Sequence, residues 1–162
     1  MINNHNWAIL NEFHEDPEIA KELLYGKCGF DRNHSKLIAE SKDYGAGFFE
    51  LNGKRIQHRI SKITPKKTGQ FVAIWKRNKE GITAPYDCSD DLDFLIITSG
   101  TEKQSGQFVF PKSVLEAKGI ISKNGKGGKR GIRVYPPWDK ATNKQAMETQ
   151  KWQVKYFLSI NH

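Results

Sequence analysis

The stretch from Arg59 to Arg77, RISKITPKKTGQFVAIWKR, decides the fold of this sequence. Two apolar runs in it are separated by the turn-forming residues TPKKTG at 64–69, a pattern that predicts a β-hairpin. Its polar positions are almost all Lys or Arg. The hairpin therefore predicts a partner as well as a sheet, because so much positive charge on two strands must face water or an anion.

Strand signals continue on both sides of the hairpin. An Asn52-Gly53 pair between apolar runs indicates a tight turn. The run FLIIT at residues 94–98 is typical of a strand that is buried on both faces. Residues 107–110 and 131–135 predict further strands. We therefore expect a sheet-rich core over residues 43–135.

Helix signals lie at both ends of the chain and once inside the core. Asp16-Pro17-Glu18 predicts a helix start within a helical N-terminal part at residues 1–42. The segment PKSVLEAKG at 111–119 predicts a short helix. A capping box that begins at Thr142 predicts a C-terminal helix over residues 142–160.

The length and the order of these elements predict one domain over residues 1–162. Its class is α+β or α/β, with a central mixed sheet flanked by helices. No apolar run is long enough to span a membrane, and the N-terminus lacks the pattern of a signal peptide. We therefore expect a cytoplasmic protein with no membrane partner, and nothing implies an obligate protein partner. Cys28 and Cys88 lie far apart and predict ordinary thiols.

Positive charge is concentrated in part of the chain. The net charge is +8, and residues 51–79 contain nine Lys and Arg but no Asp or Glu. A window of this kind indicates an extended anionic partner such as nucleic acid. The residues of the window that we predict to contact nucleic-acid phosphates are Arg59, Lys62, Lys66, Lys67, Lys76 and Arg77.

A second basic block extends from Lys118 to Arg133 and includes the glycines of NGKGGKRG at residues 124–131. Glycines let a backbone approach phosphate oxygens closely, although a flexible solvated loop is the alternative. Aromatic residues accompany both blocks, and an exposed ring can stack on an unpaired base. Trp75, inside the apolar run FVAIW, favours the core instead. The predicted nucleic-acid contacts of this block are Lys126, Lys129, Arg130, Arg133 and the ring of Trp138.

Four acidic residues precede the FLIIT run: Asp87, Asp90, Asp91 and Asp93. Carboxylates at a strand edge can hold Mg²⁺, which beside a phosphate-binding surface would suggest phosphodiester cleavage. The alternative is a solvated turn, because Asp and Ser are ordinary turn formers. The (D/E)xK pattern of many nucleases occurs at residues 40–42 and 116–118, but at the frequency expected by chance.

Several segments between residues 40 and 158 resemble the MepB family of bacterial proteins. Among the longest are KITPKKTGQFV at 62–72, QFVFPK at 107–112 and RVYPPW at 133–138. The resemblance implies a restriction-endonuclease-like fold and a nucleic-acid-binding role. In such a fold Lys62 would correspond to the catalytic lysine and Glu50 to the first acid. Ile60 stands where a second acid is expected, so Glu40 or Asp93 would have to supply that ligand.

These observations leave three functional hypotheses in order of preference. The first is a nucleic-acid-binding protein that contacts mainly phosphates, of DNA or RNA, and is not an enzyme. The second is a divalent-metal-dependent nuclease with Lys62 and Glu50 as catalytic residues and Asp91 and Asp93 as metal ligands. Mg²⁺ is expected only under this second hypothesis. The third is a partner-binding or small-anion-binding module in which the glycine-rich loop takes one phosphate group.

Overall fold

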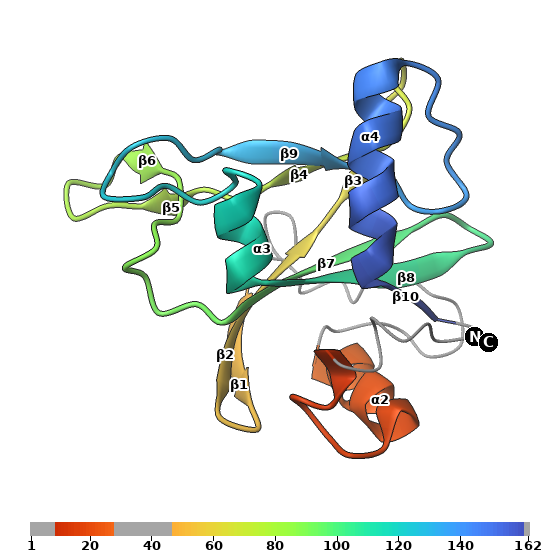
Figure 1. Ribbon diagram of the computed structural model, residues 1–162, viewed down its shortest axis with the longest axis horizontal. Coiled ribbons are helices and arrows are strands. Elements are labelled where there is room, and N and C mark those ends of the chain that lie inside the picture. Colours follow the sequence, from red (N-terminus) through yellow and green to blue (C-terminus); the bar gives the residue numbers. More distant parts are fainter. Residues whose placement is uncertain (1–8, 28–46, 161–162) are drawn as a thin grey trace.

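The computed structural model describes residues 9–27 and 47–160. Its main feature is a five-stranded sheet, the large sheet, with the order β1-β2-β7-β8-β10 (Figure 1). β2 and β7 run parallel, and the other neighbours run antiparallel. The strands are β1 (Gly47–Leu51), β2 (Lys54–Ile60), β7 (Phe94–Gly100), β8 (Ser105–Pro111) and β10 (Phe157–Ile160).

The basic hairpin leaves the large sheet and builds a second one. After β2 the chain enters β3 (Lys62–Ile63), and the predicted turn leads into β4 (Gln70–Ala73). β4 also pairs with β9 (Gly131–Val134), which completes the small sheet with the order β3-β4-β9. The predicted hairpin is therefore confirmed, although its first strand is divided between two sheets at Ser61. Two short strands, β5 (Lys76–Arg77) and β6 (Thr83–Ala84), pair with each other.

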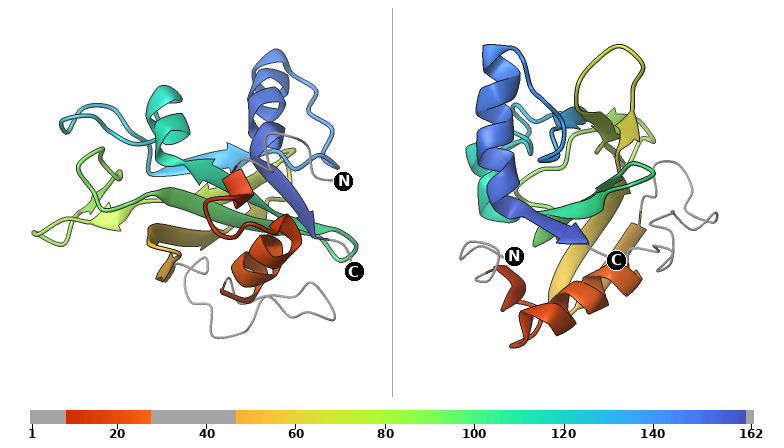
Figure 2. Two further views of the ribbon diagram at one scale, coloured as in Figure 1. Left: turned by 60° about the horizontal axis from the view of Figure 1, so that its bottom comes forward. Right: turned by 90° about the vertical axis from the view of Figure 1, so that its right-hand side faces the viewer.

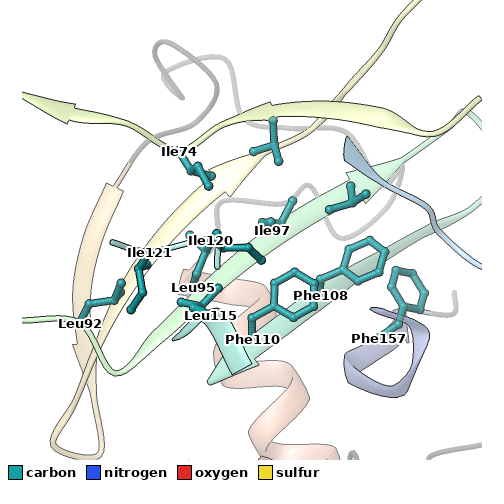
Figure 3. Close-up of a cluster of buried hydrophobic side chains, with 12 residues drawn as sticks. Ile74, Leu92, Leu95, Ile97, Phe108, Phe110, Leu115, Ile120, Ile121 and Phe157 are labelled. Carbon is teal, nitrogen blue, oxygen red and sulfur yellow. The ribbon is translucent and has the colours of Figure 1, made fainter. Parts of the chain in front are cut away.

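β7 lies between two hydrophobic cores, as the FLIIT run predicted. Six of its seven residues are buried. Leu95 and Ile97 point into the first core, which lies between the large sheet, the small sheet and two helices (Figure 3). Phe94 and Ile96 point into the second core on the opposite face. A strand that is covered on both faces needs the continuous apolar sequence that this one has.

Helices cover both faces of the large sheet. α3 (Lys112–Ala117) and α4 (Lys144–Gln153) lie on the side of the first core, where Leu115 and Trp152 pack. α2 (Pro17–Lys27) covers the opposite face (Figure 2) with Ala20 and Leu24. The helix starts predicted after Asp16 and Pro111 are confirmed. Residues 28–42 of the predicted helical part, with Cys28 and Glu40, lie outside the described residues.

The predicted C-terminal helix over residues 142–160 is wrong in its second half. α4 ends at Gln153, a single 3₁₀ turn follows over Val154–Tyr156, and Phe157–Ile160 form β10. Its N-cap is Asn143 rather than Thr142, and the Asn143 side chain accepts a hydrogen bond from Ala146 N–H. β10 is a strand because it satisfies the open edge of β8, a partner about fifty residues earlier in the chain that no local pattern reveals.

These elements form a mixed α+β single domain with a central mixed sheet and few helices. In the described part of the chain, no helix has the length and apolar character that crossing a membrane requires.

The contact between β8 and β10 gives a direct test of this C-terminal strand. A Cβ atom at Gly106 would lie 2.1 Å from the Phe157 ring and 2.6 Å from the Leu158 carbonyl oxygen. We expect Gly106→Ala to lower the free energy of unfolding by about 1–3 kcal/mol, because the backbone of β10 must shift. Chemical denaturation measures this change. Gly100→Ala, whose nearest contact would be 3.3 Å, is the matched control and should cost less; equal costs would contradict the pairing.

Candidate nucleic-acid interface

The outer face of the small sheet carries a row of three side chains across its strands. Lys62 in β3 pairs with Phe71 in β4, and Phe71 pairs with Arg133 in β9. Residues that are paired across neighbouring strands project from the same face. Lys62 and Phe71 are exposed, and Arg133 is half-buried. We call this cation–aromatic–cation arrangement the Lys62–Phe71–Arg133 row.

The position of the aromatic ring within the row depends on a glycine. The Phe71 ring lies over Gly131, where a Cβ atom would come within 2.6 Å of it. The ring therefore packs against the backbone of β9 at Gly131, while 36% of the residue remains exposed. An exposed, supported aromatic ring between two cations is an arrangement that stacks on bases in proteins that bind single strands.

The turn between β3 and β4 adds two more cations to this face. Lys66 and Lys67 are exposed, and neither pairs with a carboxylate of the described chain. Arg133 holds the turn in place, since its guanidinium donates to Thr64 Oγ1 and to the Thr68 carbonyl at 3.2 Å. The predicted contacts Lys62, Lys66, Lys67 and Arg133 are thus brought together.

The glycine-rich loop has a different construction from the one predicted. Asn124 and Gly125 both have positive φ, and Lys123 and Lys126 exchange two backbone hydrogen bonds, so residues 123–126 form a type I′ turn. The Gly125 N–H donates to Asp87 Oδ1 at 3.1 Å. The anion that this N–H binds is therefore a carboxylate of the protein itself, which argues against the predicted phosphate cradle.

Asp87 is the anchor of that loop. Its carboxylate also accepts hydrogen bonds from Ser122 Oγ at 2.6 Å and from the side chain and backbone of Ser89. These donors, Ser122 first, lower the pKa of Asp87 far below its usual range because they stabilise the charged form. The bonds from Ser122 and Gly125 tie the first part of the loop to Asp87.

Arg59 does not belong to the exposed face, and its predicted phosphate contact is wrong. The residue is only 6% exposed. Its guanidinium donates to the His58 carbonyl at 2.9 Å and to the Tyr86 hydroxyl at 2.9 Å. The sequence showed a cation in a basic window, but the partner that buries it lies 27 residues further along the chain.

The predicted contacts at the other end of the small sheet have protein partners. Lys76 pairs with Asp90 at 2.6 Å. Arg77 donates to the Gly81 carbonyl, and its guanidinium lies 5.3 Å from the centre of the Trp75 ring. Arg130 donates to the Thr83 carbonyl at 3.2 Å. Lys126 is exposed at the tip of the type I′ turn, which lies at the opposite end of the small sheet from the Lys66-Lys67 turn (Figure 1).

Trp138 is not available as an exposed stacking ring. It packs edge-on against Phe157 in the first core, with ring centres 5.6 Å apart. Its Nε1 is buried, without a hydrogen-bond partner in the described structure. The aromatic ring that does lie beside the exposed cations is Phe71. Alternation along β4, with Val72 and Ile74 facing inward, was the signal that could have identified it.

The carboxylates proposed as metal ligands or catalytic groups gather around a different cation. Arg55 pairs with Asp91 at 2.8 Å and with Asp93 at 3.3 Å, and Glu50 lies opposite it on β1. The Arg55 N–H also donates to Asp93, and these bonds lower the pKa of Asp93. Among residues 9–27 and 47–160, no three His, Cys, Asp or Glu side chains are placed to share a metal ion.

Lys62 lies far from those carboxylates. Arg55 is near the start of β2 and Lys62 follows the end of β2, so Lys62 lies seven positions further along an extended chain. That corresponds to roughly 20 Å at about 3.3 Å per residue. The four residues proposed for catalysis and metal binding therefore do not converge on one site.

A cavity of about 410 Å³ opens beside this surface, along the free edge of β9. α4 forms its opposite wall, and Lys118 lies at its rim. Of the residues predicted as nucleic-acid contacts, Lys129 and Arg133 line it. The sequence placed Lys118 in the second basic block and Trp152 in the apolar stripe of the C-terminal helix, and neither was predicted as a contact.

The fold and this surface define a single-domain α+β protein with an exposed, basic small sheet. The sequence model of the MepB-like family matches residues 39–159, and the chain therefore belongs to the MepB-like family. A crystal structure of MepB is similar to it, with 36% sequence identity and a TM-score of 0.72. The match covers 88% of this chain and 97% of that one. No curated protein matches the sequence.

The loop anchor predicts a pH-dependent contribution to stability. We expect Asp87→Asn to lower the melting temperature at pH 7, because Ser122 and Gly125 lose a charged acceptor. The folded pKa of Asp87 lies below the unfolded value of about 3.9, so its stabilisation is present above that pH and is lost as the pH falls. Thermal melts from pH 7 to pH 2 should show the difference between wild type and variant narrowing below about pH 4.

Glu102→Gln is the control for that series, since Glu102 is an exposed acid in the turn between β7 and β8. It should leave the melting temperature nearly unchanged at pH 7. A difference between wild type and Asp87→Asn that stays constant down to pH 2 would show that the charge of Asp87 does not act through these bonds.

Proposed function

We propose that this protein is a cytoplasmic nucleic-acid-binding protein that uses the outer face of the small sheet. The observation that supports this most strongly is the Lys62–Phe71–Arg133 row beside Lys66 and Lys67. Cations on neighbouring strands can contact successive phosphates of a backbone, and the ring between them can stack on a base.

The distribution of acidic residues supports the same function. Asp90, Asp91 and Asp93 pair with Lys76 and Arg55, away from the row. One carboxylate, Asp139, accepts a hydrogen bond from the Gly69 N–H at the turn, and burial raises its pKa above the ordinary value. Three acids of the central segment are therefore paired with other cations, and within the described chain Lys66 and Lys67 in the turn of the small sheet form no ion pair with them.

Cleavage is not part of the proposal. The carboxylates that would hold Mg²⁺ pair with Arg55 near the start of β2, and Lys62 lies in β3, beyond the opposite end of β2. The proposal also does not require the restriction-endonuclease-like fold that the family resemblance implied. With millimolar Mg²⁺ or Mn²⁺ we expect labelled oligonucleotides to remain intact, and cleavage that Lys62→Ala abolishes would restore the nuclease hypothesis.

Phosphate contacts should make binding depend steeply on salt. For a single-stranded oligonucleotide, we expect Lys66→Gln/Lys67→Gln to weaken binding and to reduce the slope of log K against log salt by about 1.5, because two counterion-releasing contacts are lost. Fluorescence anisotropy at several salt concentrations measures both quantities. Lys21→Gln/Lys79→Gln removes the same charge from α2 and from the β5–β6 turn, and serves as the control. Equal effects of the two pairs would indicate nonspecific attraction by net charge.

Stacking on Phe71 should favour unpaired bases. We expect Phe71→Ala to weaken binding to a single strand by about 1–3 kcal/mol and to affect a blunt duplex much less. Phe71→Tyr keeps the ring and should bind nearly as wild type. Circular dichroism melts check that the alanine variant is folded. A loss of the same size for single strand and duplex would contradict the stacking role.

A further inference from the structure

The cavity beside β9 has the composition of a ligand site. Its volume of about 410 Å³ is within the range of pockets that hold small molecules, roughly 300–1,000 Å³. Three cations line it, and no Asp or Glu stands among its described lining residues. Two aromatic side chains, Tyr135 and Trp152, line it as well. A cavity with cations and rings but no acid fits a ligand that is both anionic and planar.

Trp152 offers a ring that is fixed from behind. Phe110 packs against it in the first core, with ring centres 5.4 Å apart. Lys118 Nζ lies 5.1 Å from the centre of the Trp152 ring, a cation–π contact at the rim of the cavity. A base that stacked on this face of Trp152 would displace the Lys118 ammonium, which could then pair with the phosphate attached to that base.

The free edge of β9 supplies hydrogen-bonding groups to the wall. The Arg133 carbonyl and the Tyr135 N–H face α4, since both bond to the Gln153 side-chain amide at 3.0 and 2.8 Å. The Arg130 carbonyl points the other way, toward Ile74. Backbone groups alternate in direction along a strand, so the N–H and C=O of Gly131 face the cavity. A donor and an acceptor from one residue, side by side on the strand edge, can pair with the edge of a nucleobase.

This edge is too short for a peptide strand. Gln153 already occupies the Arg133 carbonyl and the Tyr135 N–H, so at most the N–H and C=O of Gly131 and the N–H of Arg133 remain for a ligand. Addition of a peptide strand needs a longer run of unpaired backbone. A single planar group with one phosphate could bind the open backbone groups of this edge and the lysines beside it.

We infer that the cavity lined by Lys118, Lys129, Gly131 and Trp152 binds one nucleoside phosphate, with the base against Trp152 and Gly131 and the phosphate between the two lysines. The ligand is either a free nucleotide or one unpaired nucleotide of a nucleic-acid chain. The second source rests on the proposed function, because Arg133 belongs to both the cavity and the exposed row. The first source stands without it.

Titration of the full chain with adenosine 5′-monophosphate tests the inference. Calorimetry should show saturable binding of the nucleotide, at least tenfold tighter than adenosine or inorganic phosphate alone. Amide resonances of Gly131 and the indole resonance of Trp152 should shift in NMR spectra. Lys118→Gln/Lys129→Gln should weaken the affinity at least tenfold, whereas the control pair Lys21→Gln/Lys79→Gln should not.

The outcomes separate this inference from the proposed function. One outcome would overturn the inference and leave the proposed function intact. In it, a single-stranded oligonucleotide binds through Lys66 and Lys67, the mononucleotide does not bind, and Lys118→Gln/Lys129→Gln binds the oligonucleotide as tightly as wild type. If the mononucleotide binds and oligonucleotides do not, the proposed function fails and the cavity is a free-nucleotide site. Inorganic phosphate that binds as well as the nucleotide, or an acidic peptide that displaces it, would also overturn the inference.

Discussion

A buried cluster of hydrogen bonds around Ser61 is the constraint on which the rest of the structure depends. The Ser61 N–H donates to the Thr98 carbonyl, which extends the pairing of β2 with β7 by one residue. Its hydroxyl donates to Gln70 Oε1 at 2.7 Å and lies 2.6 Å from Ser99 Oγ, while the Gln70 amide reaches the Gly100 carbonyl. These polar groups are almost fully buried, so leaving any of them without a partner would be costly. The cluster fixes the point at which the chain passes from the large sheet to the small one.

The cationic face follows from that transition. Once β3 leaves the large sheet, pairing with β4 sets Lys62 and Phe71 on the outside and Val72 on the inside. β9 then extends the small sheet, and its open edge is held by α4 through the amide of Gln153. The same construction therefore provides an exposed basic row on one side of Arg133 and a cavity on the other.

Local sequence patterns predicted the elements whose partners are close in the chain or whose burial is complete. The hairpin at residues 59–77 and the β7 run were of this kind. The prediction failed where a distant partner decides the outcome. Phe157 and Leu158 fit an apolar helical stripe as well as a strand, and only the edge of β8 selects the strand. Arg59 is buried against Tyr86, 27 residues further along the chain. Asp93 binds Arg55, 38 residues earlier in the chain. The charge pattern predicted an anionic partner. Which of the cations lie together on one exposed face could be known only from the register of β3, β4 and β9.

The most direct test of this account is a map of backbone NMR shifts during titration with a short single-stranded oligonucleotide. The account predicts that the largest changes fall on β3, the turn at residues 64–69, β4 and β9, with the wall of the cavity at Gly131 included. Amides of α2 and of β1 should stay in place. Changes centred on Arg55, Asp91 and Asp93, or spread evenly over the exposed lysines, would contradict the claim that the small sheet is the binding surface.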